Sequence, residues 1–299
     1  MLERILVPLD GSELADRIVN PLTALLAKSS DVSLITVVPS AVLPQDHPPG
    51  HNPLTIARKH LGLRRDELTE KGVCAHTRLA IGDAASKVLE WAKEHGTTLI
   101  VMATHGRTGA DRLIRGSTAE RVLRHSPVPV LLANPKALEA TEELRFKKIL
   151  VPLDGSERSA EIIPDVVELA RVHGSEILLF YGIPIDVQLE PWAAAGPVMT
   201  QADGEKLLEP FLSRFYDVPV RRVVALGAPA ISILATAEDE KVDLIAMTTH
   251  GRTGASRWFF GSVAEQVTRN ATCPLLVKRT AGPPLEGKKQ SVTVATAAH

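Results

Sequence analysis

The chain contains the same stretches of sequence twice, at a spacing of about half its length. Residues 5–13, ILVPLDGSE, recur unchanged at residues 149–157, and residues 104–110, THGRTGA, recur unchanged at residues 249–255. This period is far longer than the roughly 20–50 residues of a solenoid repeat, so each copy should be a whole domain. We therefore predict a first domain at residues 1–136, a second domain at residues 145–279, and a terminal tail at residues 280–299, which we expect to be mobile.

Within each copy, short apolar segments alternate with amphipathic ones. In the first copy, the strand-like segments are residues 5–9, 32–38, 74–80, 99–103 and 128–133. The segments with helical spacing are residues 12–28, 55–71, 84–95 and 117–125. Strands that alternate with helices and are apolar on both faces indicate a parallel sheet covered by helices. The pattern predicts an α/β fold: two tandem doubly wound domains, each a five-stranded parallel sheet flanked by helices.

Composition excludes several classes of function. The 299 residues carry a formal net charge of -1, which offers no basic field for binding nucleic acid. The two cysteines, Cys74 and Cys273, are far apart and outside any CxxC pair, which argues against a disulfide framework and a zinc site. A strand-like segment begins at Ile5, and no apolar run reaches the about 18 residues of a membrane span. We expect a soluble cytoplasmic protein with no signal peptide and no metal site.

The loop after the fourth strand is the strongest candidate for a ligand site. Ligands of doubly wound sheets bind at the carboxyl ends of the strands. In this loop, Gly106 is followed after nine residues by Gly116 and Ser117, where a helix starts. Glycines let a ligand approach the backbone, and a helix start offers unpaired N–H groups, so the loop suits a phosphate. The alternative is that the glycines only shape a turn and Ser117 only caps the helix.

Polar residues near these loops have weaker assignments. Asp10 and its repeat Asp154 follow the first strand, where a carboxylate either accepts hydrogen bonds from a nucleoside or only shapes a turn. His105 and His250 lie beside the glycines with no second ligand at metal-binding spacing. A structural or phosphate-adjacent role is therefore favoured over catalysis for both histidines.

Standard enzyme signatures are absent from the sequence. No GxxxxGK[ST] loop, no GxGxxG after a strand, no GxSxG and no HExxH occurs. Arg107 and Arg252 are candidates for contact with terminal phosphates, although surface solvation explains them equally well. Phosphoryl transfer would need a magnesium ligand and a positioned water, for which Asp10 and Ser117 are the only candidates. We therefore expect no strong catalytic activity.

At these motifs the sequence resembles the universal stress protein family, over residues 1–136 and 145–279. The motifs are VPLDGS after the first strand and MATHGRTG, or MTTHGRTG in copy two, followed by GS and a helix. The family's ATP-binding pattern is a glycine, two residues, a glycine, nine residues, and a glycine before serine or threonine. Its second and third glycines match as Gly106 and Gly116 in copy one and as Gly251 and Gly261 in copy two.

Two departures from the family pattern distinguish the copies. The first glycine is replaced by Ala103 in copy one and by Thr248 in copy two, whose branched side chain falls where phosphate would approach. Members that bind ATP pair its adenine with the backbone after the second strand, at Val37 in copy one and Gly182 in copy two. The resemblance therefore implies more reliable binding in copy one than in copy two.

The resemblance implies an ATP site in each copy, with Mg²⁺ if the phosphates react. In copy one, the residues expected at the nucleotide are Pro8, Leu9, Asp10, Ser12, Val37, Ala103, His105, Gly106, Arg107, Gly109, Gly116, Ser117 and Thr118. In copy two, they are Pro152, Leu153, Asp154, Ser156, Gly182, Thr248, His250, Gly251, Arg252, Gly254, Gly261, Ser262 and Val263.

The resemblance also implies an assembly and a function. The fifth strands of two family domains pair, so residues 128–133 and 275–278 would pair within this chain as a pseudo-dimer, with a homodimer of chains as a further option. The leading hypothesis is an ATP-binding regulatory protein of the stress response, with no nucleic-acid or membrane partner. The alternatives are a nucleotide-independent scaffold or partner-binding module, favoured by Ala103 and Thr248, and a slow ATP hydrolase.

Overall fold

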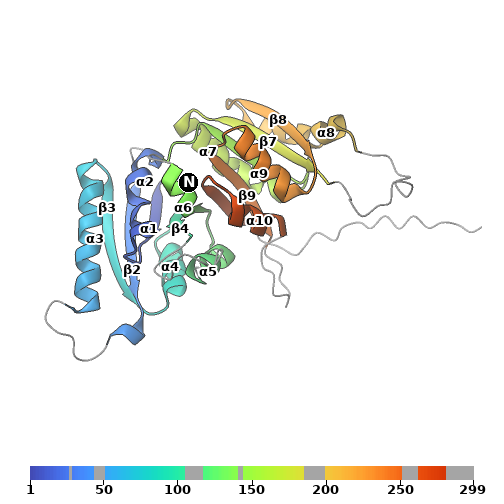
Figure 1. The fold of residues 1–299 in the computed structure, drawn as a ribbon. Coiled ribbons are helices and arrows are strands. Elements are labelled where there is room, and N and C mark those ends of the chain that lie inside the picture. Colours follow the sequence, from blue (N-terminus) through green and yellow to red (C-terminus); the bar gives the residue numbers. More distant parts are fainter. Residues whose placement is uncertain are drawn as a thin grey trace, which may run out of the picture.

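A single sheet runs through both copies of the repeat. The computed structural model describes residues 1–26, 29–43, 51–104, 117–140, 144–184, 199–250 and 262–280. These residues form a 10-stranded sheet in the order β3-β2-β1-β4-β5-β10-β9-β6-β7-β8, with helices on both faces (Figure 1). Neighbouring strands are parallel within each half of the sheet, which confirms the predicted α/β fold of two tandem, helix-flanked parallel sheets.

The first domain follows the predicted alternation of strands and helices. Its elements in chain order are β1 (Arg4–Pro8), α1 (Glu13–Asp16), α2 (Val19–Leu25), β2 (Asp31–Val38), the 3-10 helix η1 (Ser40–Val42), α3 (Pro53–Glu70), β3 (Cys74–Ile81), α4 (Ala84–Glu94), β4 (Leu99–Ala103), α5 (Ser117–His125), β5 (Val130–Ala133) and α6 (Pro135–Ala140).

The second domain repeats this order. Its elements are β6 (Lys148–Pro152), the 3-10 helix η2 (Ser159–Ile162), α7 (Ile163–His173), β7 (Glu176–Ile183), α8 (Gln201–Leu212), the 3-10 helix η3 (Ser213–Phe215), β8 (Val220–Leu226), α9 (Pro229–Asp239), β9 (Leu244–His250), α10 (Ser262–Asn270) and β10 (Leu275–Thr280). The predicted tail lies outside the described residues, apart from Thr280, which ends β10.

Besides shifts of one or two residues at the ends of several elements, two elements depart from the prediction where proline intervenes. The helix expected at residues 12–28 is divided into α1 and α2 around Arg17 and Ile18. Pro21 lacks an N–H and its ring clashes with the carbonyl four residues earlier, that of Arg17, so the helix cannot run on unbroken. The last strand of the first domain begins at Val130 rather than at residue 128, after Pro129, which cannot donate a ladder hydrogen bond.

The two domains are joined by the fifth strand of each. Strands β5 and β10 pair antiparallel, with Leu275 opposite Leu132, Leu276 opposite Leu131 and Val277 opposite Val130. The predicted pairing within one chain is therefore confirmed. Because each strand covers the open edge of the other, neither domain presents that edge to a foreign strand.

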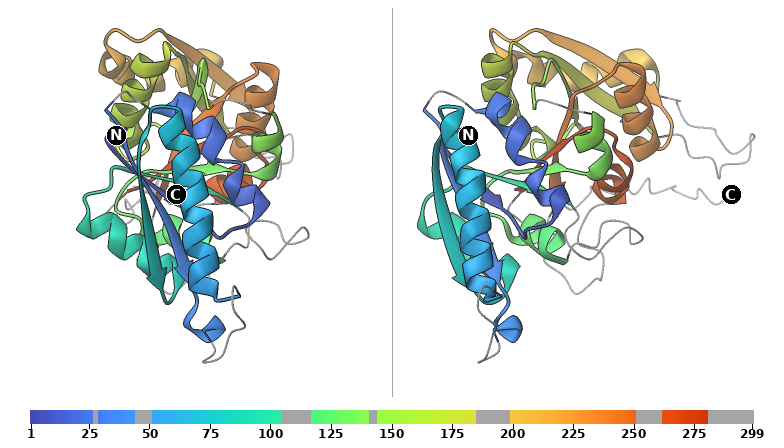
Figure 2. Two further views of the ribbon diagram at one scale, coloured as in Figure 1. Left: turned by 90° about the vertical axis from the view of Figure 1, so that its left-hand side faces the viewer. Right: turned by 60° about the vertical axis from the view of Figure 1, so that its left-hand side comes forward.

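Helices cover both faces of the sheet (Figure 2), and an apolar layer lies between the helices and the sheet on each face. On one face α2, α3, α7 and α8 bury their apolar residues against the sheet, and on the other α4, α5, α9 and α10 do so. Both layers continue across the β5–β10 junction: Leu131 and Leu276 belong to the first layer, and Leu132 and Leu275 to the second. Burial is therefore shared between the domains rather than completed within each.

The close packing of α8 on the sheet gives a first prediction. A Cβ added at Gly204 would lie 2.7 Å from a methyl of Val224 on β8, whereas one added at Gly62 in α3 would meet nothing within 4 Å. Alanine should therefore stabilise the protein at position 62 by about 0.5–1 kcal/mol through helix propensity. At position 204 the same gain is opposed by overpacking, and we expect a free energy of unfolding about 1–3 kcal/mol below that of Gly62→Ala.

Urea denaturation of the two alanine variants measures this difference directly. Both positions lie inside helices, so the gain in helix propensity from glycine to alanine is the same at each. The difference in unfolding free energy between the two variants therefore reports the contact with Val224. Equal unfolding midpoints for the two variants would show that α8 moves away from β8 at no cost.

Candidate functional site

In each domain the predicted ligand positions lie at the carboxyl ends of the strands, where the direction of strand succession reverses; the antiparallel β5–β10 junction places these ends at opposite edges of the whole sheet. In the first domain this reversal falls between β1 and β4, which pair through Ile5 and Leu99. In the second domain it falls between β6 and β9, which pair through Ile149 and Leu244. In doubly wound sheets, the carboxyl edge at such a reversal is the usual ligand position.

A cavity of about 280 Å³ opens at this position in the second domain. Six of the predicted site residues line it: Pro152, Leu153, Asp154, Gly182, Thr248 and Val263. Seven further residues complete its wall: Ser159, Phe180, Tyr181, Pro184, Pro229, Ile233 and Met247. The fold thus brings together residues from the ends of β6, β7 and β9 and from the starts of α9 and α10.

The aspartate after the first strand of each domain closes a tight turn. In the second domain, Asp154 Oδ1 accepts hydrogen bonds from the N–H of Ser156 at 2.9 Å and from its hydroxyl at 2.6 Å. In the first domain, Asp10 Oδ1 accepts from the N–H of Ser12 at 2.9 Å. The glycine between them has a positive φ in both copies, so VPLDGS encodes the same turn twice. Both aspartates therefore shape a turn, which uses one carboxylate oxygen of each, and their contact with a nucleoside stays a prediction.

The end of the second strand differs between the domains as the sequence suggested. Val37 and Gly182 occupy equivalent positions, since they pair with Ala80 of β3 and Ala225 of β8. Gly182 lines the cavity, and a Cβ at this position would lie 3.4 Å from the ring of Phe180. The valine of the first domain instead packs against the apolar layer of its face. The absence of a side chain at position 182 enlarges the cavity beside β7.

The two replacements of the first family glycine are both buried. Ala103 ends β4 and is 9% exposed, and Thr248 lies near the end of β9 and is 7% exposed. Thr248 also lines the cavity. The larger residue is therefore accommodated in the wall of the site without closing it.

The helices that follow the glycine loops begin at Ser117 and Ser262. Thr118 is half-buried, Ser262 is exposed, and Val263 lines the cavity. Pro8 ends β1 and is half-buried, and Leu9 is buried. Other predicted residues are described only in part or not at all. His105, Gly106, Arg107, Gly109, Gly116, Gly251, Arg252, Gly254 and Gly261 lie outside the described residues, and for Ser117 and His250 only the backbone is described.

The helix after the first glycine loop is tied to its neighbour by an ion pair. Asp83 caps α4 by accepting from the N–H of Ser86 at 2.9 Å, and Arg121 of α5 donates to its other oxygen at 2.6 Å. The Arg121 guanidinium, with Ser86, holds the pKa of Asp83 well below its usual range. The second domain has Ala228 and Gln266 at these positions, and Ala228 makes no side-chain cap. The middle of α5 is thus linked to the start of α4 by a contact that Ala228 and Gln266 do not make in the second domain.

The sequence missed the contribution of the third strand's end and of Tyr181. Pro229 and Ile233 line the cavity from α9, which follows β8, and this fourth segment at the carboxyl edge was predictable from the same topological rule. Tyr181 precedes Gly182 in a strand expected to be buried on both faces, so no sequence pattern distinguished it from the other strand residues. Burial, and then the carboxylate of Asp154, raise the pKa of Tyr181, which keeps its phenol protonated as a hydrogen-bond donor.

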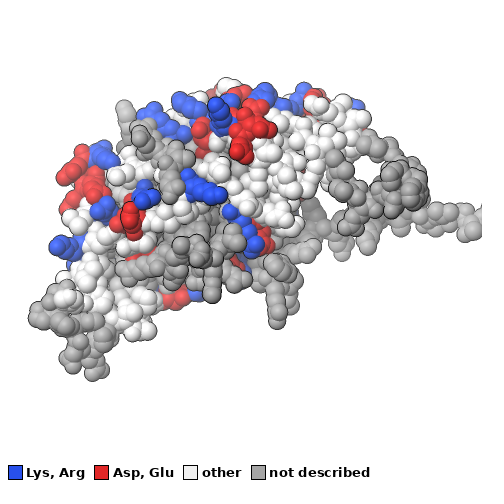
Figure 3. Space-filling model, in the orientation of Figure 1, with Lys and Arg blue, Asp and Glu red and all other residues white. Residues whose placement is uncertain are grey.

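The described wall of the cavity is mostly apolar and contains two ionisable side chains, those of Asp154 and Tyr181. This set suits the recognition of a neutral aromatic and hydroxylated group more than acid–base chemistry. On the face drawn in Figure 3, basic and acidic side chains are interspersed, with no continuous basic area among the coloured residues. Among the described residues, no helix is long and apolar enough to cross a membrane.

Comparison with known proteins identifies the repeat. The Universal stress protein family model matches residues 1–134 and again residues 145–279. A universal stress protein of Methanocaldococcus jannaschii is 32% identical over 142 residues, which cover 44% of this chain and 81% of that protein. Another, from Mycolicibacterium smegmatis, is 26% identical over 214 residues, 70% of each chain.

A solved structure has the same fold over nearly the whole chain. The crystal structure of a universal stress protein from Archaeoglobus fulgidus matches with a TM-score of 0.72 at 19% identity, over 94% of this chain and 97% of that one. Both halves of the chain match the family model, and the turn after each first strand has the geometry that the shared motif predicts. The chain therefore belongs to the universal stress protein family, with two family domains in tandem.

Proposed function

We propose that this protein is an ATP-binding regulatory member of its family, in which bound nucleotide rather than catalysis carries the signal. The observation that supports this most is the cavity at the strand reversal of the second domain. It lies where doubly wound sheets bind nucleotides, and it is lined by Thr248 of β9 and Val263 of α10, the two elements that flank the glycine-rich residues 251–261 in the sequence.

The cavity has the dimensions and chemistry of a nucleoside site. Its volume of about 280 Å³ is just below the about 300–1,000 Å³ typical of ligand pockets, so it suits a base and ribose rather than a whole nucleotide. Phe180, Ile233 and Met247 provide apolar surface for a purine. The phosphates would extend toward the start of α10, where backbone N–H groups and the helix dipole favour negative charge.

The relative affinity of the two domains stays a prediction. A small residue, Ala103, in place of Thr248 favours the first domain, as does the ion pair that fixes α5. The open cavity and the turn at Asp154 support binding in the second domain as well. One nucleotide per chain would indicate that a single domain binds, and two per chain would indicate that both domains bind.

The decisive experiment begins with the purified protein as isolated. Denaturation should release ATP, detected by mass spectrometry, at one or two molecules per chain. Release of ADP or AMP alone would support slow hydrolysis instead. If nothing is released and calorimetry with ATP detects no heat, the nucleotide proposal is wrong and a scaffold or partner-binding role takes its place.

Substitution of the turn aspartates provides a residue-level prediction. Asp154→Ala removes a charged acceptor from the wall of the cavity and should weaken ATP binding to the second domain by about 10- to 100-fold. Asp154→Asn keeps the acceptor of the turn but removes the charge, so it should fall between the wild type and Asp154→Ala. Calorimetric titration measures both affinities.

The equivalent aspartate of the first domain provides a matched variant, and an exposed aspartate provides a control. Asp10→Ala should weaken ATP binding to the first domain, and the double variant Asp10→Ala/Asp154→Ala should weaken ATP binding to both domains. Asp239→Ala, at an exposed aspartate that ends α9, should leave the isotherm unchanged. An unaltered isotherm for the double variant would remove the aspartates from the site.

A further inference from the structure

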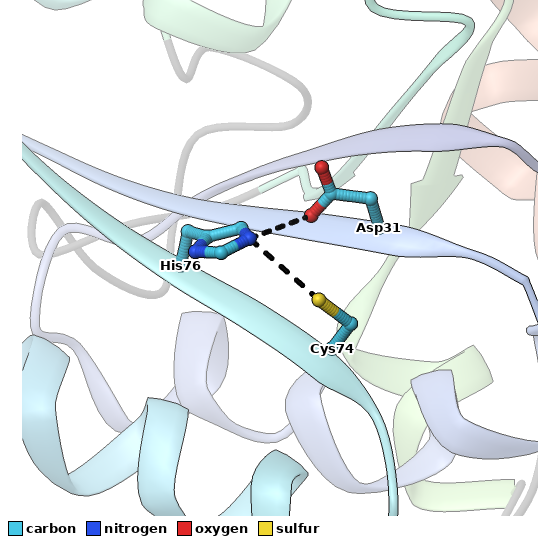
Figure 4. A group of neighbouring side chains, drawn as sticks. All are labelled: Asp31, Cys74 and His76. Carbon is cyan, nitrogen blue, oxygen red and sulfur yellow. Dashed lines mark hydrogen bonds and ion pairs between the residues drawn. The ribbon is translucent and has the colours of Figure 1, made fainter.

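Three potential metal ligands meet at the amino ends of two neighbouring strands in the first domain. Asp31 begins β2, and Cys74 and His76 lie at the start of β3 (Figure 4). The nucleotide positions follow the carboxyl ends of the parallel strands, whereas this cluster is at their amino ends. It is therefore a separate feature of the first domain.

The strand register explains why these side chains share a face. Asp31 lies directly beside Cys74 in the parallel pair, and His76 is two residues further along the same strand. Side chains of register partners, and of residues two apart, point to the same side of a sheet. The alternate residues Ala75 and Leu79 face the apolar layer that includes α3, which leaves Cys74 and His76 on the outer side, both exposed.

The distances between the ligand atoms fit one tetrahedral ion. His76 Nε2 lies 3.6 Å from Cys74 Sγ and 3.3 Å from Asp31 Oδ1, and all three atoms lie within 4.8 Å of one another. With Zn–N and Zn–O bonds of about 2.0–2.1 Å and a Zn–S bond of about 2.3 Å, neighbouring ligands of a tetrahedral zinc are about 3.3–3.6 Å apart. The distances from His76 Nε2 to Cys74 Sγ and to Asp31 Oδ1 therefore match the separations expected between ligands of one tetrahedral zinc ion.

Asp31 also carries an oxygen that its surroundings do not satisfy. Its Oδ1 is buried and accepts no hydrogen bond among the described residues, although the side chain as a whole is 46% exposed. This oxygen is the one that faces His76 Nε2. A buried carboxylate oxygen without a hydrogen bond is costly, and a cation bound between it and the imidazole would satisfy it more fully than the 3.3 Å ion-pair contact with His76 does.

The second domain shows what the same positions contain when no ligand set is present. The register places Glu176, Pro219 and Arg221 at the positions of Asp31, Cys74 and His76. Arg221 donates to Glu176 at 3.4 Å and to Glu240 at 2.8 Å, which makes an ordinary surface ion-pair network. Arginine and proline cannot ligate a metal, so the ligating set is particular to the first domain.

We propose that Asp31, Cys74 and His76 bind one Zn²⁺ ion, with water in the fourth position. A thiolate, an imidazole and a carboxylate together favour zinc over the harder Mg²⁺ and Ca²⁺. Binding releases the thiol proton of Cys74 to solvent, leaves His76 neutral and gives a site of no net charge. The ion links β2 to the edge strand β3. A search of the sequence for closely spaced cysteine pairs misses these three ligands, because Asp31 and Cys74 become neighbours only through strand pairing.

Zinc competition on the full-length, untagged chain tests the proposal. Titration of Zn²⁺ against a chromophoric chelator should give one tight site per chain. Cys74→Ser, His76→Gln and Asp31→Asn should each weaken it by about 100-fold or more, since loss of even an outer-shell partner typically costs 10–100-fold. Co²⁺ in place of Zn²⁺ should give tetrahedral ligand-field bands and a thiolate charge-transfer band, and Cys74→Ser should abolish the latter.

Matched variants separate zinc binding from folding. The double variant Asp31→Glu/His76→Arg introduces the acidic and basic residues found in the second domain, so it should fold with wild-type circular dichroism yet bind no zinc. Cys273→Ala, at the buried cysteine of the second domain, should retain the site. Equal zinc affinity in the double variant and the wild type, or a Co²⁺ spectrum without a thiolate band, would overturn the proposal.

Discussion

Replacement of Leu276 with alanine is expected to lower the free energy of unfolding by about 2–5 kcal/mol. Leu276 is 0% exposed, lies in β10 opposite Leu131 of β5, and belongs to the apolar layer that continues through both domains. Truncation removes buried methyl groups and leaves a cavity that two packed strands cannot readily fill. Ile231→Ala is the control: that side chain is 66% exposed and should contribute less than about 0.5 kcal/mol.

The same substitution tests whether the junction couples the two domains. Of the three tryptophans, Trp91 lies on α4 of the first domain. In a background with Trp192→Phe and Trp258→Phe, its fluorescence reports the unfolding of the first domain alone. Leu276→Ala lies in the second domain, yet it should lower the urea midpoint seen by Trp91. A midpoint that stays at the background value would mean that the domains unfold independently and that their shared core carries little stability.

The sequence predicted the fold well because the repeat and the alternation are strong local signals. Strand β4 occupies the predicted residues, and the helix predicted at residues 84–95 is α4, which ends one residue earlier, before the positive-φ Gly96. The pairing of β5 with β10 followed from the family resemblance and from the need to cover an open edge. The divided helix at Arg17 was readable in principle from Pro21, since proline's effect falls four residues earlier.

The candidate site was only partly predictable, because part of it is created by packing. Asp154, Gly182 and Thr248 were identified from motifs, whereas Pro229 and Ile233 reach the cavity only through the placement of α9 beside β7. Likewise Asp31 and Cys74 are distant in sequence and adjacent in space through strand register. Motifs specify contacts within a segment, and contacts between segments depend on register and helix placement.

His173 should make stability depend on pH between about 4 and 6.5. It is 9% exposed at the end of α7, where Nε2 has no hydrogen-bond partner among the described residues and the ring of Phe146 lies 5.3 Å away. Burial, followed by the positive charges of Arg145 and Lys147, lowers the pKa of His173 from 6.5 to about 4. The native protein therefore keeps this imidazole neutral at pH values where the unfolded chain protonates it.

The sign of the effect follows from proton binding. Between pH 4 and 6.5 the unfolded state binds the extra proton, so the free energy of unfolding falls as pH falls through this window. The full contribution is about 3 kcal/mol, present above pH 6.5 and lost by about pH 4. Chemical denaturation at closely spaced pH values measures the slope directly.

Removal of the imidazole should remove this slope. His173→Leu replaces a buried, unsatisfied polar ring with an apolar side chain, so stability above pH 6.5 should be kept or slightly raised while the loss between pH 6.5 and 4 largely disappears. His125→Leu, at an exposed histidine of α5, serves as the matched control and should leave the slope in place. If His173→Leu keeps the wild-type pH dependence, the prediction is wrong. Other groups would then cause the loss of stability at low pH, and His173 would accept a proton in the folded protein as readily as in the unfolded chain.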